Sequence, residues 1–262
     1  MAGEKTDAAS VKAVVKTIQI IEEMAHRDQV GVTEIATATG ISKATAFRFL
    51  STLEQLGYVQ QANQSLYCLS LKLFELGSII RARRSKLDDV RPTLHSLATA
   101  TRETVHLATL EGDHLVYLYK IESTLSLKVS MMSEIGRSAP LYCTGVGKVM
   151  LAYQPTEQQD RLINSTVLKR FTPKTITDLA GLKDELSRIV SNGYALDDEE
   201  HELGVRCVAA PIHNSDREVI AALSVSAPSA RLTDDKIQEY SANVCTYAQK
   251  ISVIVGAGSW TS

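Results

Sequence analysis

The chain has 262 residues, of which 44% are hydrophobic and 22% are charged. This length and composition are typical of a globular protein of about two domains. No apolar run approaches the roughly 20 residues of a membrane-spanning helix and no signal segment opens the sequence, so we expect a cytoplasmic protein without membrane contact. The net charge of −2 argues against a nonspecific polyanion binder, and the four cysteines form no Cys-x-x-Cys pair, which predicts reduced thiols rather than a disulfide framework or a zinc site.

Residues 10–25 predict the first helix. Its apolar residues recur at helical spacing on one face, which is made by Val14, Ile18, Ile21 and Ala25. We expect this face to pack against the elements that follow, as the support of a small helical domain.

Residues 33–56 predict a helix-turn-helix. Thr33 is expected to cap a short first helix, and Gly40 to end it, because glycine readily adopts the left-handed backbone of a sharp turn. Ser42 is expected to cap the second helix, whose apolar face is made by Ala46, Leu50 and Leu53. In this motif the N-terminal part of the second helix enters the DNA major groove.

A helix pair with a glycine turn also occurs in many helical proteins, so the pair alone leaves DNA binding and plain structural packing open. Two predicted strands, residues 58–61 and 66–71, follow around a polar turn at 62–65. This hairpin is typical of the wing of a winged helix and favours DNA binding. The residues that we expect to contact DNA are Thr33, Ser42, Lys43, Thr45, Arg48 and Asn63.

The net charge differs between the two parts of the chain and is +2 over residues 1–84 and −4 over residues 85–262. This suits an N-terminal domain that touches DNA and a larger domain that does not. We assign residues 10–71 to the winged helix-turn-helix, 72–86 to a linker helix and 87–262 to a C-terminal domain. Arg81, Arg83 and Arg84 near the end of the linker are read either as a solvated helix end or as a phosphate contact.

From residue 104 the hydrophobic period becomes strand-like. Strands are predicted at 104–110, 115–121, 126–131, 194–196, 205–212 and 219–227, and helices at 145–151, 156–163, 178–192 and 234–255. This order predicts an α+β domain, in which helices pack on an antiparallel sheet.

Residues 145–148, GVGK, resemble part of a phosphate-binding loop. A Walker A loop needs glycine where Tyr142 stands and serine or threonine where Val149 stands, so the sequence excludes a nucleoside triphosphate site of this type. What remains is a glycine-rich entry to a helix, whose free N–H groups bind a carboxylate or another small anion.

Residues 197–202, DDEEHE, are read as a metal cluster, an acid–base pair or a solvated loop, and one inward acid would accept hydrogen bonds from ligand hydroxyls. Cys207 begins an apolar strand, and Ser224 and Ser226 alternate onto one face of the next strand. We therefore predict a polar pocket whose floor is formed by the two serine hydroxyls, with the cysteine and a helix N-terminus above them.

Cys207 has two readings, a nucleophile with His201 as its base or a buried cysteine that acts as a small apolar residue. His95, His106 and His114 lack metal-ligand spacing and are read as structural histidines. We expect no metal site and no cofactor.

Several segments together resemble the IclR family of bacterial transcription regulators. They are residues 42–50 (SKATAFRFL), 67–76 (YCLSLKLFEL), 140–148 (PLYCTGVGK) and 193–212 (GYALDDEEHELGVRCVAAPI). They occur in the family's order over nearly the whole chain. Residues 103–123 and 140–153 are most similar to the branch that responds to sugar-acid catabolites such as 2-keto-3-deoxygluconate.

The resemblance implies a transcriptional repressor that binds a palindromic double-stranded DNA operator as a homodimer or homotetramer. It also implies a GAF/PAS-like C-terminal domain that binds a small carboxylate effector, a sugar acid or 2-keto acid. By the family's pattern the effector pocket involves Met131, Ala139, Gly145, Val146, Asp197, Val205, Cys207, Ser224 and Ser226. Val146, in place of a common alanine, is expected to narrow the pocket, and Thr144 replaces a common serine.

The competing hypothesis is a small-molecule enzyme. In it Cys207 or the acidic residues 197–202 are catalytic, and the N-terminal domain is only a dimerisation module. The resemblance favours the regulator.

Overall fold

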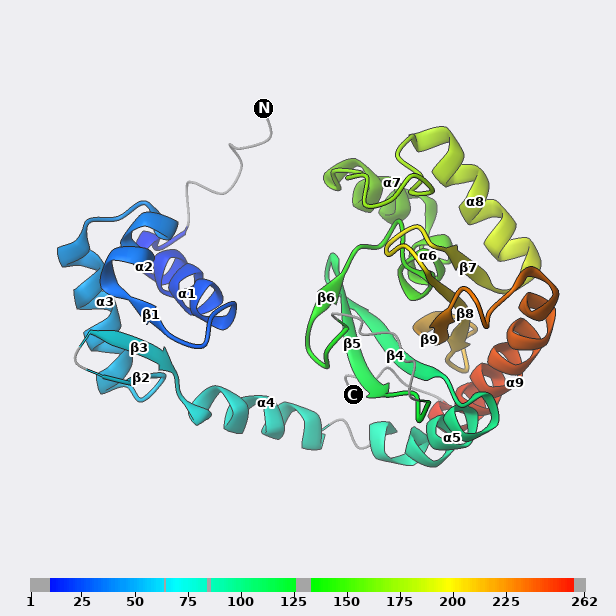
Figure 1. Cartoon of the computed structure of the whole chain (residues 1–262), viewed down its shortest axis with the longest axis horizontal. Coiled ribbons are helices and arrows are strands. Elements are labelled where there is room, and N and C mark those ends of the chain that lie inside the picture. Colours follow the sequence, from blue (N-terminus) through cyan, green and yellow to red (C-terminus); the bar gives the residue numbers. More distant parts are fainter. Residues whose placement is uncertain (1–9, 64, 84–85, 126–132, 257–262) are drawn as a thin grey trace. The chain divides into compact units, whose positions relative to one another are not determined.

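The computed structural model describes residues 10–63, 65–83, 86–125 and 133–256 of the chain (Figure 1). The chain divides into two compact units, Met1–Arg83 and Arg84–Ser262. Among the described helices, none combines the length and the apolar composition needed to cross a membrane.

The N-terminal unit is a winged helix-turn-helix. Its elements in chain order are α1 (Lys12–Ala25), β1 (Val30–Gly31), α2 (Val32–Thr39), α3 (Lys43–Gln55), β2 (Val59–Gln61), β3 (Leu66–Leu69) and α4 (Leu71–Arg83). The strands form an antiparallel sheet in the order β1-β3-β2. The wing is therefore closed by β1, a two-residue strand that the sequence pattern does not reveal.

The turn between α2 and α3 has the predicted chemistry at two positions. Gly40 has a φ of 66°, in the left-handed region, and ends α2. The Ser42 side chain accepts a hydrogen bond from the N–H of Thr45 at 3.1 Å and so caps α3. The cap predicted at Thr33 is wrong: α2 begins at Val32, and the Glu34 carboxylate accepts the N–H of Gly31 at 2.7 Å instead.

The predicted core face of α1 is wrong at Val14 and Ile18 but correct at Ile21, which packs against the core of this unit. Ile20 and Met24 are buried in this unit's core, whereas Val14 is 58% exposed and Ile18 is 49% exposed. Helical spacing identifies an apolar stripe on a helix but not the surface against which that stripe packs. In this unit the face of α1 that packs against the core is centred on Ile20 and Met24 instead. An apolar stripe of α1 therefore faces away from the core of its own unit.

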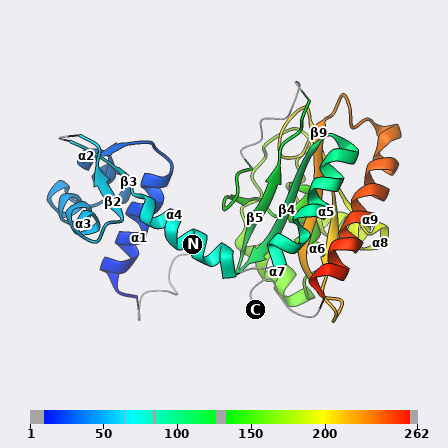
Figure 2. The ribbon, with the colours of Figure 1, turned by 90° about the horizontal axis from the view of Figure 1, so that it is seen from below.

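The C-terminal unit is a six-stranded antiparallel sheet with helices on both faces (Figures 1 and 2). Its strands are β4 (Thr104–Glu111), β5 (His114–Ile121), β6 (Ser138–Ala139), β7 (Ala195–Asp198), β8 (Val205–His213) and β9 (Val219–Pro228), in the order β6-β5-β4-β9-β8-β7. Its helices are α5 (Lys86–Thr101), α6 (Gly145–Ala152), α7 (Thr156–Ser165), α8 (Leu179–Asn192) and α9 (Ile237–Val255), with a 3-10 turn at Asp234–Lys236. The predicted strand at 126–131 lies outside the described residues, and β6 forms where a loop was expected.

The two faces of this sheet carry different side chains. Large aliphatic residues such as Leu107, Leu223 and Val225 meet α5 and α9 on one face (Figure 2). Alanines line the other face, at positions 108, 195, 209 and 222, and meet α6 and its neighbours. Small side chains let α6 approach the sheet closely. That close approach puts the N-terminus of α6 directly on the strands.

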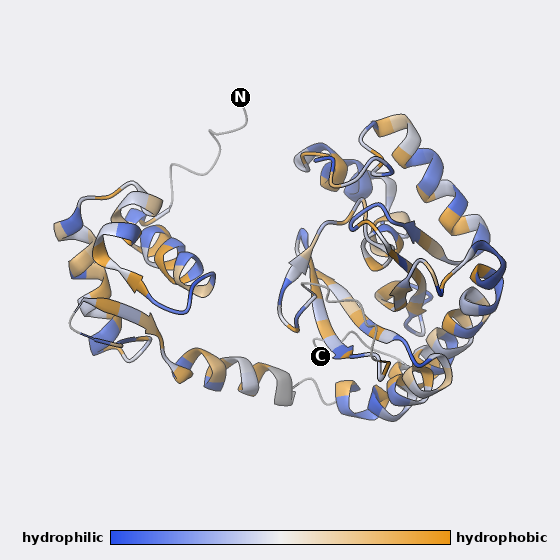
Figure 3. Ribbon diagram, viewed as in Figure 1, coloured by the Kyte–Doolittle hydropathy of each residue, from blue (hydrophilic) through white to orange (hydrophobic). Residues whose placement is uncertain are grey.

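The hydropathy pattern agrees with this packing (Figure 3), since β8 is apolar over most of its length, as a strand covered on both faces requires, and the buried apolar residues of α8 lie on one face. Gly193 ends α8 with a φ of 76°, as a helix stop of this kind requires. The α+β architecture is as predicted.

Candidate ligand site and DNA-binding face

The N-terminal half of α3 presents polar side chains to solvent. Lys43 and Arg48 are exposed, and Ser42 and Thr45 are joined by a hydroxyl–hydroxyl contact of 2.8 Å within the cap. Phe47, which sequence reasoning missed, is 53% exposed between them. The outer surface of the helix therefore combines cations, hydroxyls and one aromatic ring.

Two other residues expected at DNA have structural partners. The Asn63 side chain accepts the N–H groups of Ser65 and Leu66, each at 3.2 Å, and so holds the turn of the wing. Thr33 is exposed in the first turn of α2, and its carbonyl accepts the Thr37 hydroxyl. Asn63 therefore shapes the wing, whatever it contacts outside the chain.

In the C-terminal unit, strand register brings most of the expected effector residues onto one sheet face. Asp197 on β7 lies opposite Cys207 on β8, and Cys207 lies opposite Ser226 on β9. In the next row, Ala209 lies opposite Ser224. Val205 is two residues before Cys207 and shares its face.

The N-terminus of α6 lies over these rows. A Cβ added at Gly145 would be 3.3 Å from the Cβ of Ala209 and 3.5 Å from that of Cys207. The Thr144 hydroxyl accepts the N–H of Gly147 at 3.2 Å, which leaves the N–H groups of Gly145 and Val146 without an intrahelical acceptor. Glycine at 145 thus lets the first turn of α6 pack directly against β8 beside the polar rows.

Asp197 and Glu200 are the two buried acids of the acidic run, and Asp197 is 2% exposed. Its carboxylate accepts the N–H of Glu200 at 2.8 Å. Burial, together with the charge of Glu200, raises the pKa of Asp197 to about 7, although Lys148 and the backbone N–H groups of Glu200 and His201 oppose the rise. Near neutral pH this carboxyl is therefore present in both protonation states.

Cys207 is a buried thiol rather than an activated nucleophile. Burial and then the charge of Asp197 raise its pKa, and the hydrogen bond to Ser226 only partly opposes this. Since the thiolate is the reactive species, a raised pKa argues against covalent chemistry at Cys207.

His106 and Tyr117 belong to the same face, and sequence reasoning assigned neither to the site. His106 on β4 lies opposite Ser224, and its Nδ1 is 3.4 Å from the Ser226 hydroxyl. Its ring is 5.2 Å from that of Tyr117. The pKa of Tyr117 is raised by burial and then by Cys207 and Asp197, which reflects their proximity. The register between strands places His106 and Tyr117 on this face, and this register cannot be read from the sequence.

Two of the expected pocket residues are not placed beside Asp197, Cys207 and the two serines. Ala139 on β6 lies opposite Leu115 on β5, and Leu115 lies opposite Leu110 on β4. Leu110 is four residues along β4 from His106. At about 3.3 Å per residue this is roughly 13 Å along the strand. Met131 lies outside the described residues.

A buried cation, Lys148 of α6, anchors the helix to the sheet edge. Its side chain is fully buried, and Nζ donates to the Leu196 carbonyl at 2.6 Å and to Glu185 Oε1 at 3.1 Å, and also to Glu200 Oε1. Burial opposes the charge of Lys148, but Glu200 and Glu185 outweigh burial and raise its pKa. The lysine is therefore charged, and this ion cluster fixes α6 against β7.

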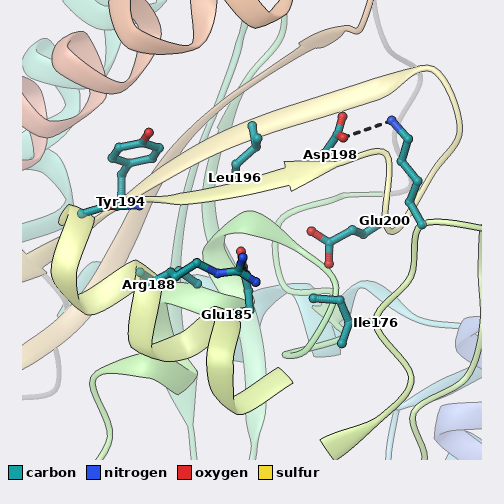
Figure 4. A pocket seen from close by; sticks show the side chains of 10 residues that line it. Ile176, Glu185, Arg188, Tyr194, Leu196, Asp198 and Glu200 are labelled. Carbon is teal, nitrogen blue, oxygen red and sulfur yellow. Dashed lines mark hydrogen bonds and ion pairs between the residues drawn. The ribbon is translucent and has the colours of Figure 1, made fainter. Parts of the chain in front are cut away.

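A separate cavity of about 460 Å³ opens between α8 and β7 (Figure 4). Its lining includes Glu185, Arg188, Tyr194, Asp198 and Glu200, and Figure 4 shows these side chains around it. None of the nine expected effector residues lines this cavity. Acids and bases alternate around it, with Lys174 bonded to Asp198 at 3.0 Å, so it has no strong preference for one sign of charge.

No metal site was found in the described ranges, in which no three His, Cys, Asp or Glu side chains are arranged to hold an ion.

A winged helix-turn-helix followed by a separate domain with a buried polar cluster defines a class of protein, the ligand-responsive transcriptional regulator. The family models agree: residues 13–62 match the IclR helix-turn-helix domain, and residues 85–253 match the C-terminal domain of bacterial transcriptional regulator IclR. The chain belongs to the IclR family. It is a DNA-binding transcriptional regulator and not an enzyme.

Relatives cover nearly the whole chain. HTH-type transcriptional regulator KdgR of Escherichia coli (strain K12) is 38% identical over 94% of this chain and 94% of its own length. Transcriptional repressor IclR of the same organism is 32% identical over 94% of this chain and 90% of its own. The crystal structure of Thermotoga maritima IclR superposes with a TM-score of 0.73 at 33% identity, over 93% of this chain and 98% of that one.

Replacing Lys148 with methionine should destabilise the C-terminal unit by about 3 kcal/mol, because the buried carboxylate of Glu200 then loses its cation, whereas the partly buried Glu185 retains Arg188 as a partner. Urea unfolding followed by circular dichroism measures this. Lys183→Met is the matched control, since Lys183 pairs with Asp160 at 2.7 Å on the surface and should cost less than about 1 kcal/mol. Equal effects of the two substitutions would contradict the anchoring role of Lys148.

Proposed function

We propose that the protein is a repressor of a sugar-acid catabolic operon, and that a small carboxylate effector bound beneath the N-terminus of α6 lowers or raises its affinity for the operator. The observation that carries the proposal is the joint presence of two N–H groups, at Gly145 and Val146, and the buried polar rows that include Asp197 and Ser226. Its similarity to KdgR, and to the sugar-acid branch of the family, supports a sugar-derived 2-keto acid as ligand.

The ligand's carboxylate would accept hydrogen bonds from the α6 N-terminus, where the helix dipole also favours negative charge. Ser224, Ser226 and the protonated form of Asp197 would bond its keto and hydroxyl oxygens. Val205 and the Cys207 thiol would supply apolar walls, and Ala139 with Met131 would contribute only if the ligand reaches toward β6.

At the operator, the exposed face of α3 would enter the major groove. Arg48 is suited to bidentate contact with guanine, Phe47 to contact with a thymine methyl, and Lys43 to phosphate. Two copies would read the two halves of a palindromic operator, whose half-sites lie about 34 Å apart.

Dimerisation would use the apolar surface that the N-terminal unit leaves uncovered. On α1 this surface includes Val14 and Ile18, and on α4 it includes Phe74, which is 74% exposed, and Ile80, which is 59% exposed. Exposed apolar side chains in such number are typical of a surface that another protein covers. We infer a homodimer through these helices, and a homotetramer would add contacts between C-terminal units.

Effector binding would then change operator affinity by favouring one arrangement of the paired chains, with a coupling of typically 1–3 kcal/mol. The linker helix α4 would carry the change. Gel shifts on the DNA that flanks the protein's own gene, with and without 2-keto-3-deoxygluconate, test the proposal as a whole. A shift that no sugar acid or 2-keto acid alters would contradict it.

Arg48→Ala should weaken specific operator binding by about 5- to 150-fold, because one bidentate base contact contributes about 1–3 kcal/mol of discrimination. Fluorescence anisotropy against specific and scrambled duplexes at moderate salt measures this. Arg161→Ala, at an exposed arginine paired with Asp113 in the C-terminal unit, is the control and should leave binding unchanged. Retained operator affinity in the Arg48 variant would remove this residue from the groove.

The double substitution Val14→Asp with Ile18→Asp should convert the dimer to monomer at micromolar concentration, since it puts charges into the proposed apolar interface. Sedimentation velocity measures the change. Val167→Asp, at a position that is 86% exposed, is the control for adding a surface charge. An unchanged sedimentation coefficient in the double variant would exclude α1 from the interface.

Effector affinity should fall as pH rises through about 7, because Asp197 is neutral below its raised pKa and repels the ligand's carboxylate above it. We expect about a tenfold fall between pH 6 and pH 8, equivalent to roughly 1.4 kcal/mol. Isothermal titration calorimetry at several pH values measures it. Asp197→Asn should give a flat profile, and a wild-type profile that is already flat would refute the assignment.

A further inference from the structure

We propose that His106 selects the effector by bonding its hydroxylated tail, so that sugar-derived acids bind in preference to short 2-keto acids that share the same head group. This inference rests on the proposed function, and it gives a role to a histidine that the sequence pattern predicts to be structural.

Its position is the first argument. His106 lies one strand beyond the serines, opposite Ser224 and in contact with Ser226 through Nδ1 at 3.4 Å. Gly145 lies over Cys207 and Ala209 on β8, two strands away from β4. Two strand spacings are about 10 Å. A six-carbon acid with a hydrogen bond at each end spans this length, whereas a three-carbon acid bound at Gly145 does not reach His106.

The partners of His106 are the second argument. Its other nitrogen, Nε2, is 2.8 Å from the hydroxyl of Ser133, so both ring nitrogens contact serine hydroxyls. A hydroxyl can donate or accept and rotates freely, so a ligand hydroxyl can take the place of either serine without leaving a ring nitrogen unsatisfied. The same exchange would be costly if His106 were held by a carboxylate or a backbone carbonyl.

The charge of the ring is the third argument. His106 is 1% exposed, and burial followed by the nearby charge of Lys120 lowers its pKa to about 3. The imidazole is therefore neutral at physiological pH and offers one donor and one acceptor. A neutral ring matches the donor and acceptor of a ligand hydroxyl but does not compete with the α6 N-terminus for the carboxylate.

The remaining neighbours complete a tail-binding wall. The Tyr117 ring, 5.2 Å from the imidazole, covers one side with an apolar surface, and Thr104 follows on the same face of β4. Buried hydroxyls and an imidazole beside one aromatic ring are groups that can bind a polyhydroxylated chain.

Calorimetric titration of the full-length protein with 2-keto-3-deoxygluconate and with pyruvate tests the inference, because the two acids share a 2-keto carboxylate head and differ in the tail. His106→Phe keeps an aromatic ring but cannot form a hydrogen bond. It should weaken 2-keto-3-deoxygluconate binding about tenfold or more, the loss expected when a site built for a hydroxyl can no longer pair it, and change pyruvate binding less than about twofold.

Controls separate selection from support of the fold. His106→Asn retains a donor and an acceptor and should recover most of the lost affinity, and His114→Phe, at an exposed position at the start of β5, should change neither affinity. Operator binding without ligand should stay at the wild-type level in every variant. If Phe is not accommodated and the variant unfolds, His106→Leu repeats the measurement with a smaller side chain.

The outcomes are distinguishable. Suppose that the wild type prefers the longer acid. If the His106 substitutions then weaken the binding of both acids equally, or of neither, the role of His106 alone is overturned. A wild type that binds neither acid would overturn the proposed function and this inference together.

Discussion

The C-terminal unit depends on a lysine ammonium held away from water. Lys148 bonds two carboxylates and the Leu196 carbonyl from a helix only eight residues long, so a single side chain joins α6, α8 and β7. Replacing such a cluster with apolar residues is often neutral for stability, whereas removing one member is costly. In this protein the main effect of the ion cluster is to fix the distance between the N-terminus of α6 and the rows of polar side chains on the sheet.

The sheet is adapted to that helix. The sheet face toward α6 carries small side chains such as Ala108, Ala209 and Ala222, whereas the face toward α5 and α9 also carries leucines and valines such as Leu107, Leu223 and Val225. Gly147 packs equally closely on the loop that leads into α6, since a Cβ there would come within 2.6 Å of the Pro140 carbonyl oxygen. In the proposed site, the N–H groups of Gly145 and Val146 and the neutral imidazole of His106 would already be in position before a ligand binds.

Sequence patterns predicted the elements that local chemistry decides. Gly40, Ser42 and Gly193 mark helix ends by backbone preference or capping, and strand alternation correctly paired Ser224 with Ser226 on one face. What failed depends on distant partners. The apolar stripe of α1 indicated a buried face but not which face, β1 is too short to have a period, and the burial of Lys148 and the location of His106 follow from pairings between residues 37 to 120 positions apart.

The linker helix α4 has a consequence for assembly. It has 13 residues and a glycine at position 77, and of the residues from 71 to 80 only Leu73 is even partly buried. A helix of this length is marginal in water, and an internal glycine costs it about a further 1 kcal/mol. Contacts from another chain would therefore supply the stability that its own chain does not. In the proposed homodimer, protomer concentration and not sequence propensity would therefore determine whether α4 is a rigid helix.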